Sequence, residues 1–256
     1  MDETPLSGRV ALITGAASGI GEAAASAIAD AGASIAALDR DAAGLDRVVS
    51  ELESAGAKAL ALPLDLIDTA SIPASVAEVL AAFGRIDILV NCAGISGEQG
   101  SILEQSEENW DRVHQVNLKA PFLLMQHVGR HMVERGGGGR IVNVSSSSAF
   151  RARQSIPPYG SSKAALVQLT RSAAADLGPY EINVNAVAPG LTATAMTGAL
   201  GDDDALGELV TEGPLANLFQ RVSQPADVAA AILFLCLPAS RQITAQTIHT
   251  SAGAVV

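Results

Sequence analysis

A glycine-rich turn between a β-rich run and an alanine-rich run constrains the fold of this chain more than any other feature. The run 9–14 reads RVALIT, which is typical of a buried strand, and Gly15, Gly19 and Gly21 follow it before a helical stretch over 22–31. A strand, a glycine turn and a helix in this order direct backbone N–H groups and the positive helix end toward a phosphate group. The spacing favours a dinucleotide-binding turn, and a glycine turn without a ligand is the alternative.

The alternation of strand-like and helical patterns continues along the whole chain. Further apolar, strand-like runs occupy residues 34–38, 59–64, 86–90, 140–144, 182–187 and 246–250. Helical stretches are predicted over 42–55, 107–134 and 159–177. Strands that alternate with helices predict an α/β fold, a Rossmann-like doubly wound parallel sheet of about seven strands with helices on both faces.

The chain shows no boundary at which it would divide. No internal repeat, linker or low-complexity tract interrupts the 256 residues, so we expect a single domain over 1–256. The regular pattern breaks only at 191–224, a stretch rich in glycine, threonine and acidic residues. We interpret it as an irregular substrate loop that could act as a lid, and the aspartates at 202–204 within it as solvated surface rather than a metal site.

The charge of the chain excludes several classes of partner. The formal net charge is −11 and the pI is about 4.7, so no basic stripe is available for nucleic acid or an anionic membrane. Cys92 and Cys236 have neither metal-type nor disulfide-type spacing, and we interpret both as buried thiols in a reducing compartment. The polar, acidic N-terminus does not resemble a signal peptide, and no apolar run approaches the ~20 residues of a membrane span. We therefore expect a cytoplasmic protein.

The residue that follows the second predicted strand indicates which dinucleotide is bound. Asp39 lies about 20 positions after the glycine turn, where an acidic side chain is expected to meet the adenosine ribose. Its carboxylate would accept bonds from the ribose hydroxyls and repel a 2′-phosphate, which favours NAD over NADP. Arg40 could instead clamp a 2′-phosphate, but the residue before Gly19 is Ser18, so only one cation is available. Asp65, at the end of the third strand, either caps the next segment or meets the adenine edge.

A second group of chemically active residues follows the fifth predicted strand. Tyr159 and Lys163 are four positions apart, so on a helix they project from one face. A cation one turn away stabilises a phenolate and lowers its pKa, which makes the phenol a usable proton carrier. Ser145 and Ser146 lie at the end of the strand that precedes them. A surface tyrosine and a solvated lysine are the alternative interpretation of the pair taken alone.

The long helical stretch over 107–134 carries two further polar features. Asn117 is a poor residue for a helix interior, so it is either locally bonded or placed beside the site. His127 and His131 have a spacing that could bind metal, but no third ligand is evident. We expect no metal site and interpret these histidines as solvated or as part of an interface.

Taken together in order, these motifs resemble those of the short-chain dehydrogenase/reductase family over nearly the whole chain. The Thr-Gly-x-x-x-Gly-x-Gly pattern of that family matches Thr14 to Gly21, and its Asn-Asn-Ala-Gly pattern is met by Asn91-Cys92-Ala93-Gly94. The resemblance implies that the catalytic residues are Asn117, Ser146, Tyr159 and Lys163. One departure is the C-terminal turn, where Thr250-Ser251-Ala252-Gly253 replaces a Val-Asp-Gly-Gly-like sequence, and this puts the detailed subunit interface in doubt.

The resemblance also implies a reaction and a set of cofactor contacts. A hydride would pass between NAD and a secondary alcohol or ketone, Tyr159 would carry the proton, Ser146 would polarise the substrate oxygen, and Lys163 would lower the pKa of Tyr159. Asn117 would hold a water that links Lys163 to solvent. The predicted cofactor contacts are Gly15, Ser18, Gly19, Ile20, Gly21, Asp39, Asp65, Leu66, Asn91, Ala93, Gly94, Tyr159, Lys163, Pro189, Gly190, Thr192 and Thr194.

Two alternatives and one open question remain at the level of sequence. NADP-dependent reduction of a carbonyl, for example a ketoacyl thioester, is the rival reaction, and a cofactor-binding protein without chemistry is the rival class. The resemblance implies a homotetramer. Arg151 and Arg153 lie between Ser146 and Tyr159, where one of them could pair with a substrate carboxylate or phosphate; otherwise both are solvated.

Overall fold

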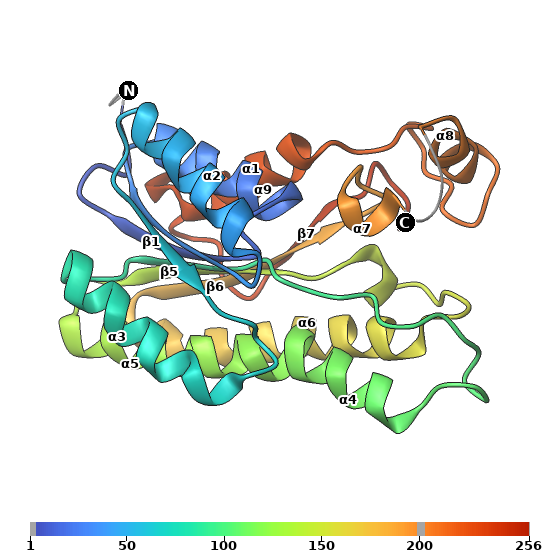
Figure 1. Cartoon of the computed structure of the whole chain (residues 1–256), viewed down its shortest axis with the longest axis horizontal. Helices are drawn as coiled ribbons and strands as arrows, with labels where there is room; N and C mark the ends of the chain where they lie inside the picture. The colour runs from blue at the N-terminus through green and yellow to red at the C-terminus, as the bar shows by residue number, and fades with distance from the viewer. Residues whose placement is uncertain (1–3, 199–202, 256) are drawn as a thin grey trace.

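Seven parallel strands form one continuous sheet at the centre of the protein (Figure 1). The computed structural model describes residues 4–198 and 203–255. The sheet has the order β3-β2-β1-β4-β5-β6-β7, and every neighbouring pair is parallel. The strands are β1 (Val10–Thr14), β2 (Ser34–Asp39), β3 (Ala59–Pro63), β4 (Ile88–Asn91), β5 (Gly139–Val144), β6 (Ile182–Pro189) and β7 (Thr247–Thr250). The predicted doubly wound parallel sheet is confirmed.

Helices cover both faces of this sheet (Figure 1). On one face lie α1 (Gly19–Asp30), α2 (Ala42–Ser54) and α9 (Pro225–Cys236). On the other lie α3 (Ile72–Phe83), α4 (Glu107–His114), α5 (Ala120–Arg135) and α6 (Pro157–Leu177). Two separate hydrophobic clusters result, one on each face, and all residues of β1, β4 and β6 are buried between them. Burial on both faces explains why these strands are continuous apolar runs rather than alternating ones.

The chain reverses its direction across the sheet between β1 and β4. It builds β1, β2 and β3 outward, returns to β4, and then builds outward on the other side. The connections that follow the carboxyl ends of β1 and β4 therefore run to opposite faces of the sheet. A crevice opens between them, at the position where open parallel sheets bind their ligands. Thr14 joins the two ends, because its Oγ1 accepts hydrogen bonds from the N–H groups of Cys92 (3.0 Å) and Ala93 (3.1 Å).

The structure corrects several expectations from the sequence. The stretch predicted as one helix over 107–134 is interrupted by a π-helical turn, Gln115–Lys119. The stretch 191–224, predicted to be irregular, contains the helices α7 (Ala195–Gly198) and α8 (Asp203–Thr211), and Asp202 lies outside the described residues. Cys236 is buried as predicted, but Cys92 is only half-buried because it faces the crevice.

Candidate active site

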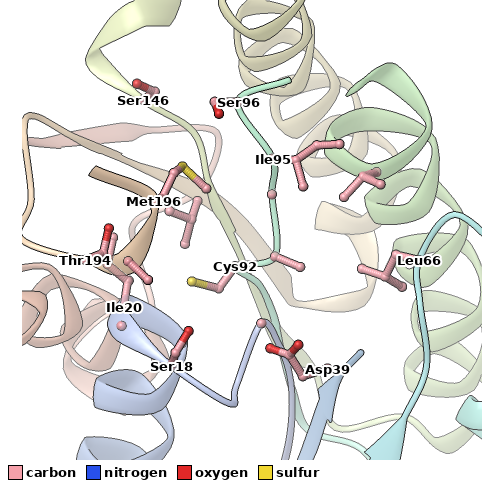
Figure 2. Close-up of a pocket in the computed structure, with 18 of the residues that line it drawn as sticks. Ser18, Ile20, Asp39, Leu66, Cys92, Ile95, Ser96, Ser146, Thr194 and Met196 are labelled. Atoms are coloured by element: carbon pink, nitrogen blue, oxygen red, sulfur yellow. The ribbon is translucent and has the colours of Figure 1, made fainter. Parts of the chain in front are cut away.

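A cavity of about 640 Å³ occupies the crevice at the carboxyl ends of the strands. Figure 2 shows Asp39 and Ser18 at one end, Ser146 and Ser96 at the other, and Cys92 between them. Its volume lies in the ~300–1,000 Å³ range of small-molecule and cofactor sites. The cavity therefore contains both groups of residues that the sequence analysis identifies, the predicted cofactor contacts around Asp39 and the predicted catalytic residues around Ser146. These two residues are 107 positions apart in the chain.

The glycines of the turn are required by the close approach of backbone to backbone. Gly15 has φ +70°, and a Cβ atom there would lie 2.9 Å from the backbone N and Cα of Ala93. A Cβ on Gly21 would collide with the carbonyl oxygen of Gly15. Gly15 lets the turn after β1 lie against the segment that follows β4, and Gly21 lets the first turn of α1, which lines the cavity, pack against Gly15.

Two acidic side chains mark the end of the cavity nearest β2 and β3. Asp39 is fixed, because its carboxylate accepts hydrogen bonds from Ala17 N–H (3.2 Å) and Asp41 N–H (3.1 Å). The carboxylate of Asp65 accepts a hydrogen bond from Ile67 N–H (3.0 Å), so it caps its own turn while it lines the cavity. Arg40 also lines the cavity and is exposed.

At the opposite end, α6 presents Tyr159 and Lys163 one turn apart. Pro157 and Pro158 occupy the first positions of this helix, where a missing N–H costs nothing, and they set its start. Lys163 is 2% exposed, its Nζ donates to the carbonyl oxygen of Val144 (2.8 Å), and Nζ lies 5.9 Å from the centroid of the Tyr159 ring. Burial lowers the pKa of Lys163 to about 8.

The pKa of Tyr159 differs from the sequence-based expectation. Burial raises it above its ordinary value, and neither a hydrogen bond with Ser146 nor the charge of Arg153, both of which lower it, offsets the burial. The ammonium group of Lys163 is directed to the carbonyl oxygen of Val144 and makes no hydrogen bond to the phenol among the described residues. The phenol is therefore protonated at neutral pH, ready to act as an acid toward a carbonyl oxygen.

The hydrogen bonds of the two serines separate their roles. Ser145 Oγ donates to the carbonyl oxygen of Lys163 (2.9 Å) and so fastens the strand end to α6. Ser146 Oγ accepts from Ser148 N–H (3.1 Å), a geometry that leaves its proton available, and it also meets the Tyr159 phenol. Both serines line the cavity, and the pairing with Tyr159 supports Ser146 as the residue that contacts the substrate oxygen.

The π-helical turn places Asn117 beside the site. Asn117 is fully buried; its Oδ1 accepts from Ile95 N–H (2.8 Å), and its Nδ2 donates to the Ile95 carbonyl (2.9 Å) and to Ser162 Oγ (3.1 Å). The extra residue of a π turn rotates the side chains that follow it, and such turns are frequent at functional sites. Asn117 does not line the cavity itself, and holds the segment that follows β4 against α6.

Gly94 lies where a proton path between Lys163 and Asn117 would run. A Cβ atom on Gly94 would be 3.2 Å from both Lys163 Nζ and Asn117 Oδ1. Gly94→Ala is expected to lower kcat by up to about tenfold, because its neighbours must move by a few tenths of an ångström and a displacement of about 1 Å at a reacting group costs about a hundredfold. Steady-state kinetics and calorimetric cofactor binding check this, with Gly207→Ala, where a Cβ meets nothing within 4 Å, as the control. A variant that only weakens cofactor binding would contradict a role in proton transfer.

Most of the predicted site residues gather around this one cavity. Asn91 and Asn117 are the exceptions; Asn91 is buried and its Nδ2 donates to Asn143 Oδ1 (2.8 Å), which ties β4 to β5. The predicted residues that line the cavity are Gly15, Ser18, Gly19, Ile20, Gly21, Asp39, Asp65, Leu66, Ala93, Gly94, Ser146, Tyr159, Lys163, Pro189, Gly190, Thr192 and Thr194. Lining residues that were not predicted include Ile95, Ser96, Arg112, Met196 and Thr197.

The remaining polar features of the sequence have structural partners or lie apart. His131 Nε2 accepts a hydrogen bond from Ile86 N–H (3.2 Å), and burial lowers the pKa of this histidine. Among residues 4–198 and 203–255, no three His, Cys, Asp or Glu side chains are arranged to hold a metal ion. None of the helices in the same residues is long and apolar enough to cross a membrane.

Comparison with known proteins agrees with this geometry. A family model described as enoyl-(acyl carrier protein) reductase matches residues 15–255. The chain is 38% identical to 2,3-dihydro-2,3-dihydroxybenzoate dehydrogenase of Bacillus subtilis over 100% of this chain and 99% of the relative. It resembles a solved 7 alpha-hydroxysteroid dehydrogenase complexed with NADH and 7-oxo glycochenodeoxycholic acid (33% identity, TM-score 0.91, covering 99% and 97%). It also resembles a short chain dehydrogenase from Burkholderia cenocepacia in complex with NADP (35% identity, TM-score 0.90, covering 98% and 99%).

Proposed function

The chain belongs to the short-chain dehydrogenase/reductase family, whose members are nicotinamide-dependent oxidoreductases that act on alcohols and ketones, and we propose that it uses NAD, with Tyr159 as the general acid and base. The observation that carries this proposal is the single cavity that has Asp39 at one end and Ser146, Tyr159 and Lys163 at the other. A dinucleotide that lay along it would bring its reactive ring to the tyrosine.

The residues of the cavity fit an extended dinucleotide. The glycine turn supplies backbone N–H groups at the start of α1 for the phosphates. Asp39 provides a fixed acceptor for ribose hydroxyls, and Leu66 offers an apolar side chain beside it. Thr192 and Thr194 also line the cavity, and Thr194 lies beside the glycine turn (Figure 2), where a Cβ atom on Gly19 would be 3.1 Å from its Cγ2; we expect these threonines to hold the carboxamide of the nicotinamide. When bound, the cofactor accepts or delivers the hydride.

The other roles belong to side chains of this protein. Tyr159 Oη transfers a proton to the substrate oxygen during reduction and takes it back during oxidation. The Ser146 hydroxyl donates a hydrogen bond to the same oxygen and stabilises the charge that develops on it. Lys163 is available to bind a ribose hydroxyl, and its cationic form favours the phenolate. Asn117 fixes Ile95 and Ser162, which keeps the wall of the site and the helix of Tyr159 and Lys163 in register.

The proposed preference for NAD rests on a difference between two neighbouring side chains, of which one is held in place by hydrogen bonds and the other is not. The carboxylate of Asp39 is held by two backbone N–H groups, whereas the Arg40 side chain is exposed and has no hydrogen-bond partner among residues 4–198 and 203–255. A fixed carboxylate repels a 2′-phosphate at all times, while a mobile guanidinium must lose rotamer entropy to bind one. The balance supports NAD.

Asp39→Ser is expected to shift the preference toward NADP by about tenfold to a hundredfold, as the ~1.5–3 kcal/mol of a hydrogen bond to a charged group implies. The ratio of kcat/KM for NAD⁺ and NADP⁺ measures it. Adding Arg40→Ala to Asp39→Ser should remove the gain with NADP⁺. A wild-type enzyme that prefers NADP⁺ would show that Arg40 outweighs Asp39.

NADP-dependent reduction of a carbonyl, such as a ketoacyl thioester, is the second candidate function. The family model carries the name of an enoyl reductase, the Burkholderia structure holds NADP, and Arg40 lines the cavity. A panel of secondary alcohols, sugars, hydroxy acids and ketones, assayed with both cofactors by the absorbance of the reduced nicotinamide, separates the candidates. Oxidation of an alcohol with NAD⁺ is the expected result; reduction with NADPH alone would favour the second candidate.

We also propose a cytoplasmic homotetramer. Large apolar side chains stand exposed on the helices that would pair, Trp110 on α4 (40% exposed) and Phe122 on α5 (43% exposed). Two free cysteines suit a reducing compartment. Light scattering on the purified protein would measure the mass of the assembly, and a monomer at micromolar concentration would contradict the assembly.

A further inference from the structure

A second cavity lies at the end of the sheet opposite the candidate active site. Its lining includes Arg9, which immediately precedes β1, Asp87, which immediately precedes β4, and Arg140, the second residue of β5. Because parallel strands begin at the same edge of a sheet, the length of the strands separates this cavity from the first. Its volume is about 110 Å³, close to that of roughly three to four water molecules at ~30 Å³ each. It therefore has room for a small ion and not for a dinucleotide.

Arginines gather at this cavity although the chain is acidic overall. The chain has 16 lysines and arginines and a net charge of −11, yet four arginines meet here around one carboxylate. Arg9 and Arg85 form ion pairs with Asp87 Oδ1, at 2.9 and 2.6 Å. Arg135 Nη2 lies 3.5 Å from the same oxygen. Arg140, the fourth, has no ion pair in the described part of the chain, so the cluster carries an excess of positive charge.

Arg140 has donors that the fold leaves without acceptors. Its side chain is half-buried, and its Nη1 donates to the carbonyl oxygen of Gly139 (2.9 Å). Its Nε is buried and has no hydrogen-bond partner among residues 4–198 and 203–255. The negative charge of Glu181 acts on Arg140 from an exposed side chain, and burial lowers the pKa of Arg140 in spite of it. Buried donors without acceptors are rare in folded proteins, and a bound ion is one of the groups that satisfy them.

The connection between α5 and β5 adds backbone donors to the same wall. Gly137 and Gly138 line the cavity, and their N–H groups make no hydrogen bond within the residues that the structure describes. Arg135 Nη2 donates to the carbonyl oxygen of Gly138 (2.7 Å) and holds this connection in place. The Cys236 thiol, also in the lining, is uncharged because burial raises its pKa to about 12. Asp87 is therefore the only negatively charged group in the described lining.

We propose that this cavity binds a small tetrahedral oxyanion, phosphate or sulfate, between Arg9 and Arg140. Guanidinium groups match the geometry of phosphate oxygens, and donors line the cavity from β5, from the segment before β1 and from the α5–β5 connection. An ion that accepts hydrogen bonds on all sides therefore fits better than a planar carboxylate. The charge of Asp87 is offset by the arginines that bind it. No step of the proposed hydride transfer uses this site.

Thermal unfolding in two salts tests the proposal. Wild type, Arg140→Met and Arg171→Met are compared in sodium chloride and in sodium phosphate of equal ionic strength and pH. Methionine keeps an unbranched apolar stem but has no donor, and Arg171, exposed on α6, is the matched control. In chloride, Arg140→Met should be at least as stable as wild type, because it removes an unpaired, half-buried charge. In phosphate, wild type and Arg171→Met should gain in Tm, and Arg140→Met should keep only the general stabilisation by this salt.

Calorimetry measures the binding itself. Inorganic phosphate is titrated into the same proteins with and without NAD⁺, because the glycine turn of the first cavity is a second place where phosphate would bind. Arg140→Met is expected to weaken the affinity about tenfold to a hundredfold, the worth of a hydrogen bond to a charged group. Saturating NAD⁺ should leave the wild-type affinity unchanged. Glycerol 3-phosphate, titrated in parallel, shows whether a free ion or the phosphate group of an ester binds more tightly.

Several outcomes would overturn the oxyanion site. Equal gains in Tm for all three proteins in phosphate, or equal phosphate affinities in wild type and Arg140→Met, would mean that the cavity holds only water. Loss of phosphate binding in the presence of NAD⁺ would place the ion at the glycine turn instead. If Arg140→Met does not fold, Arg140→Gln replaces it, and an unchanged phosphate affinity in that variant rejects the site. None of these results bears on hydride transfer, which the cofactor assay tests separately.

Discussion

Tyr159→Phe is expected to lower kcat by a factor of ~10²–10⁴, the usual contribution of a general acid–base group. Phenylalanine keeps the ring and its packing on α6 but removes the only atom that transfers the proton. The phenol of Tyr159 meets Ser146, the residue that we expect to bind the substrate oxygen. The loss should therefore appear in kcat rather than in cofactor affinity. Stopped-flow or steady-state rates with NAD⁺ and the best alcohol measure the first quantity, and calorimetry of NAD⁺ binding measures the second.

The chain contains only one other tyrosine, which provides a matched control. Tyr180 lies after α6 and is 51% exposed, so Tyr180→Phe should retain the wild-type rate. The raised pKa of Tyr159 adds a pH readout: the phenolate needed for alcohol oxidation forms as pH rises, so oxidation should accelerate with pH in the wild type and lose this dependence in Tyr159→Phe. A Tyr159→Phe enzyme that keeps near wild-type turnover would eliminate the mechanism, and would revive a protein that binds the cofactor without using it.

The parts of the site that follow local rules were predictable from the sequence. The turn at Gly15 depends on a short strand, a positive φ and a helix start, all of which are adjacent in the chain. Tyr159 and Lys163 share one face of α6 because their spacing matches a helical turn. The order of strands and helices likewise dictated a doubly wound sheet, and the carboxyl ends of that sheet brought Asp39 and Ser146 to one cavity.

Other parts depend on contacts between distant segments, which no local pattern encodes. The pKa of Tyr159 is raised because the surrounding chain buries the phenol, and Lys163 donates its hydrogen bond to the carbonyl oxygen of Val144. Arg151 and Arg153 are equivalent in the sequence, and only the carbonyl groups of Pro214 and Ala254 distinguish them. The π-helical turn at Asn117 carries no sequence signature beyond a residue that fits poorly in a helix.

The sequence does not predict one cluster of charged residues around a buried carboxylate, because the residues come from distant segments of the chain. Asp87 immediately precedes the amino end of β4, is 3% exposed, and so lies at the end of this strand opposite the candidate active site. Its carboxylate accepts hydrogen bonds from Arg9 Nη1 (2.9 Å), Arg85 Nε (2.7 Å) and Val10 N–H (3.1 Å). Arg135 Nη2 lies 3.5 Å away. This carboxylate joins the segments before β1 and β4 to the end of α5.

Asp87→Asn is expected to lower the free energy of unfolding by about 1–3 kcal/mol, the cost of losing hydrogen bonds to a buried charged group whose arginine partners are themselves 36–46% exposed. An amide of nearly the same shape cannot accept all these bonds, and its N–H group would face arginines. Chemical denaturation at neutral pH measures the loss. Asp46→Asn, on the exposed face of α2, is the control and should stay within about 0.5 kcal/mol of wild type. If Asp87→Asn fails to fold, Arg85→Gln, which leaves Arg9 and Val10 in place, should show a smaller loss.

The pH dependence of this loss has a defined sign. Burial alone would raise the pKa of Asp87, but the hydrogen bonds from Arg85 and Arg9 outweigh it and hold the pKa below the ordinary value of 3.8. A carboxyl with a depressed pKa stabilises the folded state above its unfolded pKa, and this contribution is lost as pH falls through the folded value. The difference between wild type and Asp87→Asn should therefore be constant above about pH 5 and shrink in more acidic solution, where the unfolded carboxyl is protonated first. A difference that stayed the same down to the acid unfolding transition would mean that Asp87 acts through packing and not through its charge.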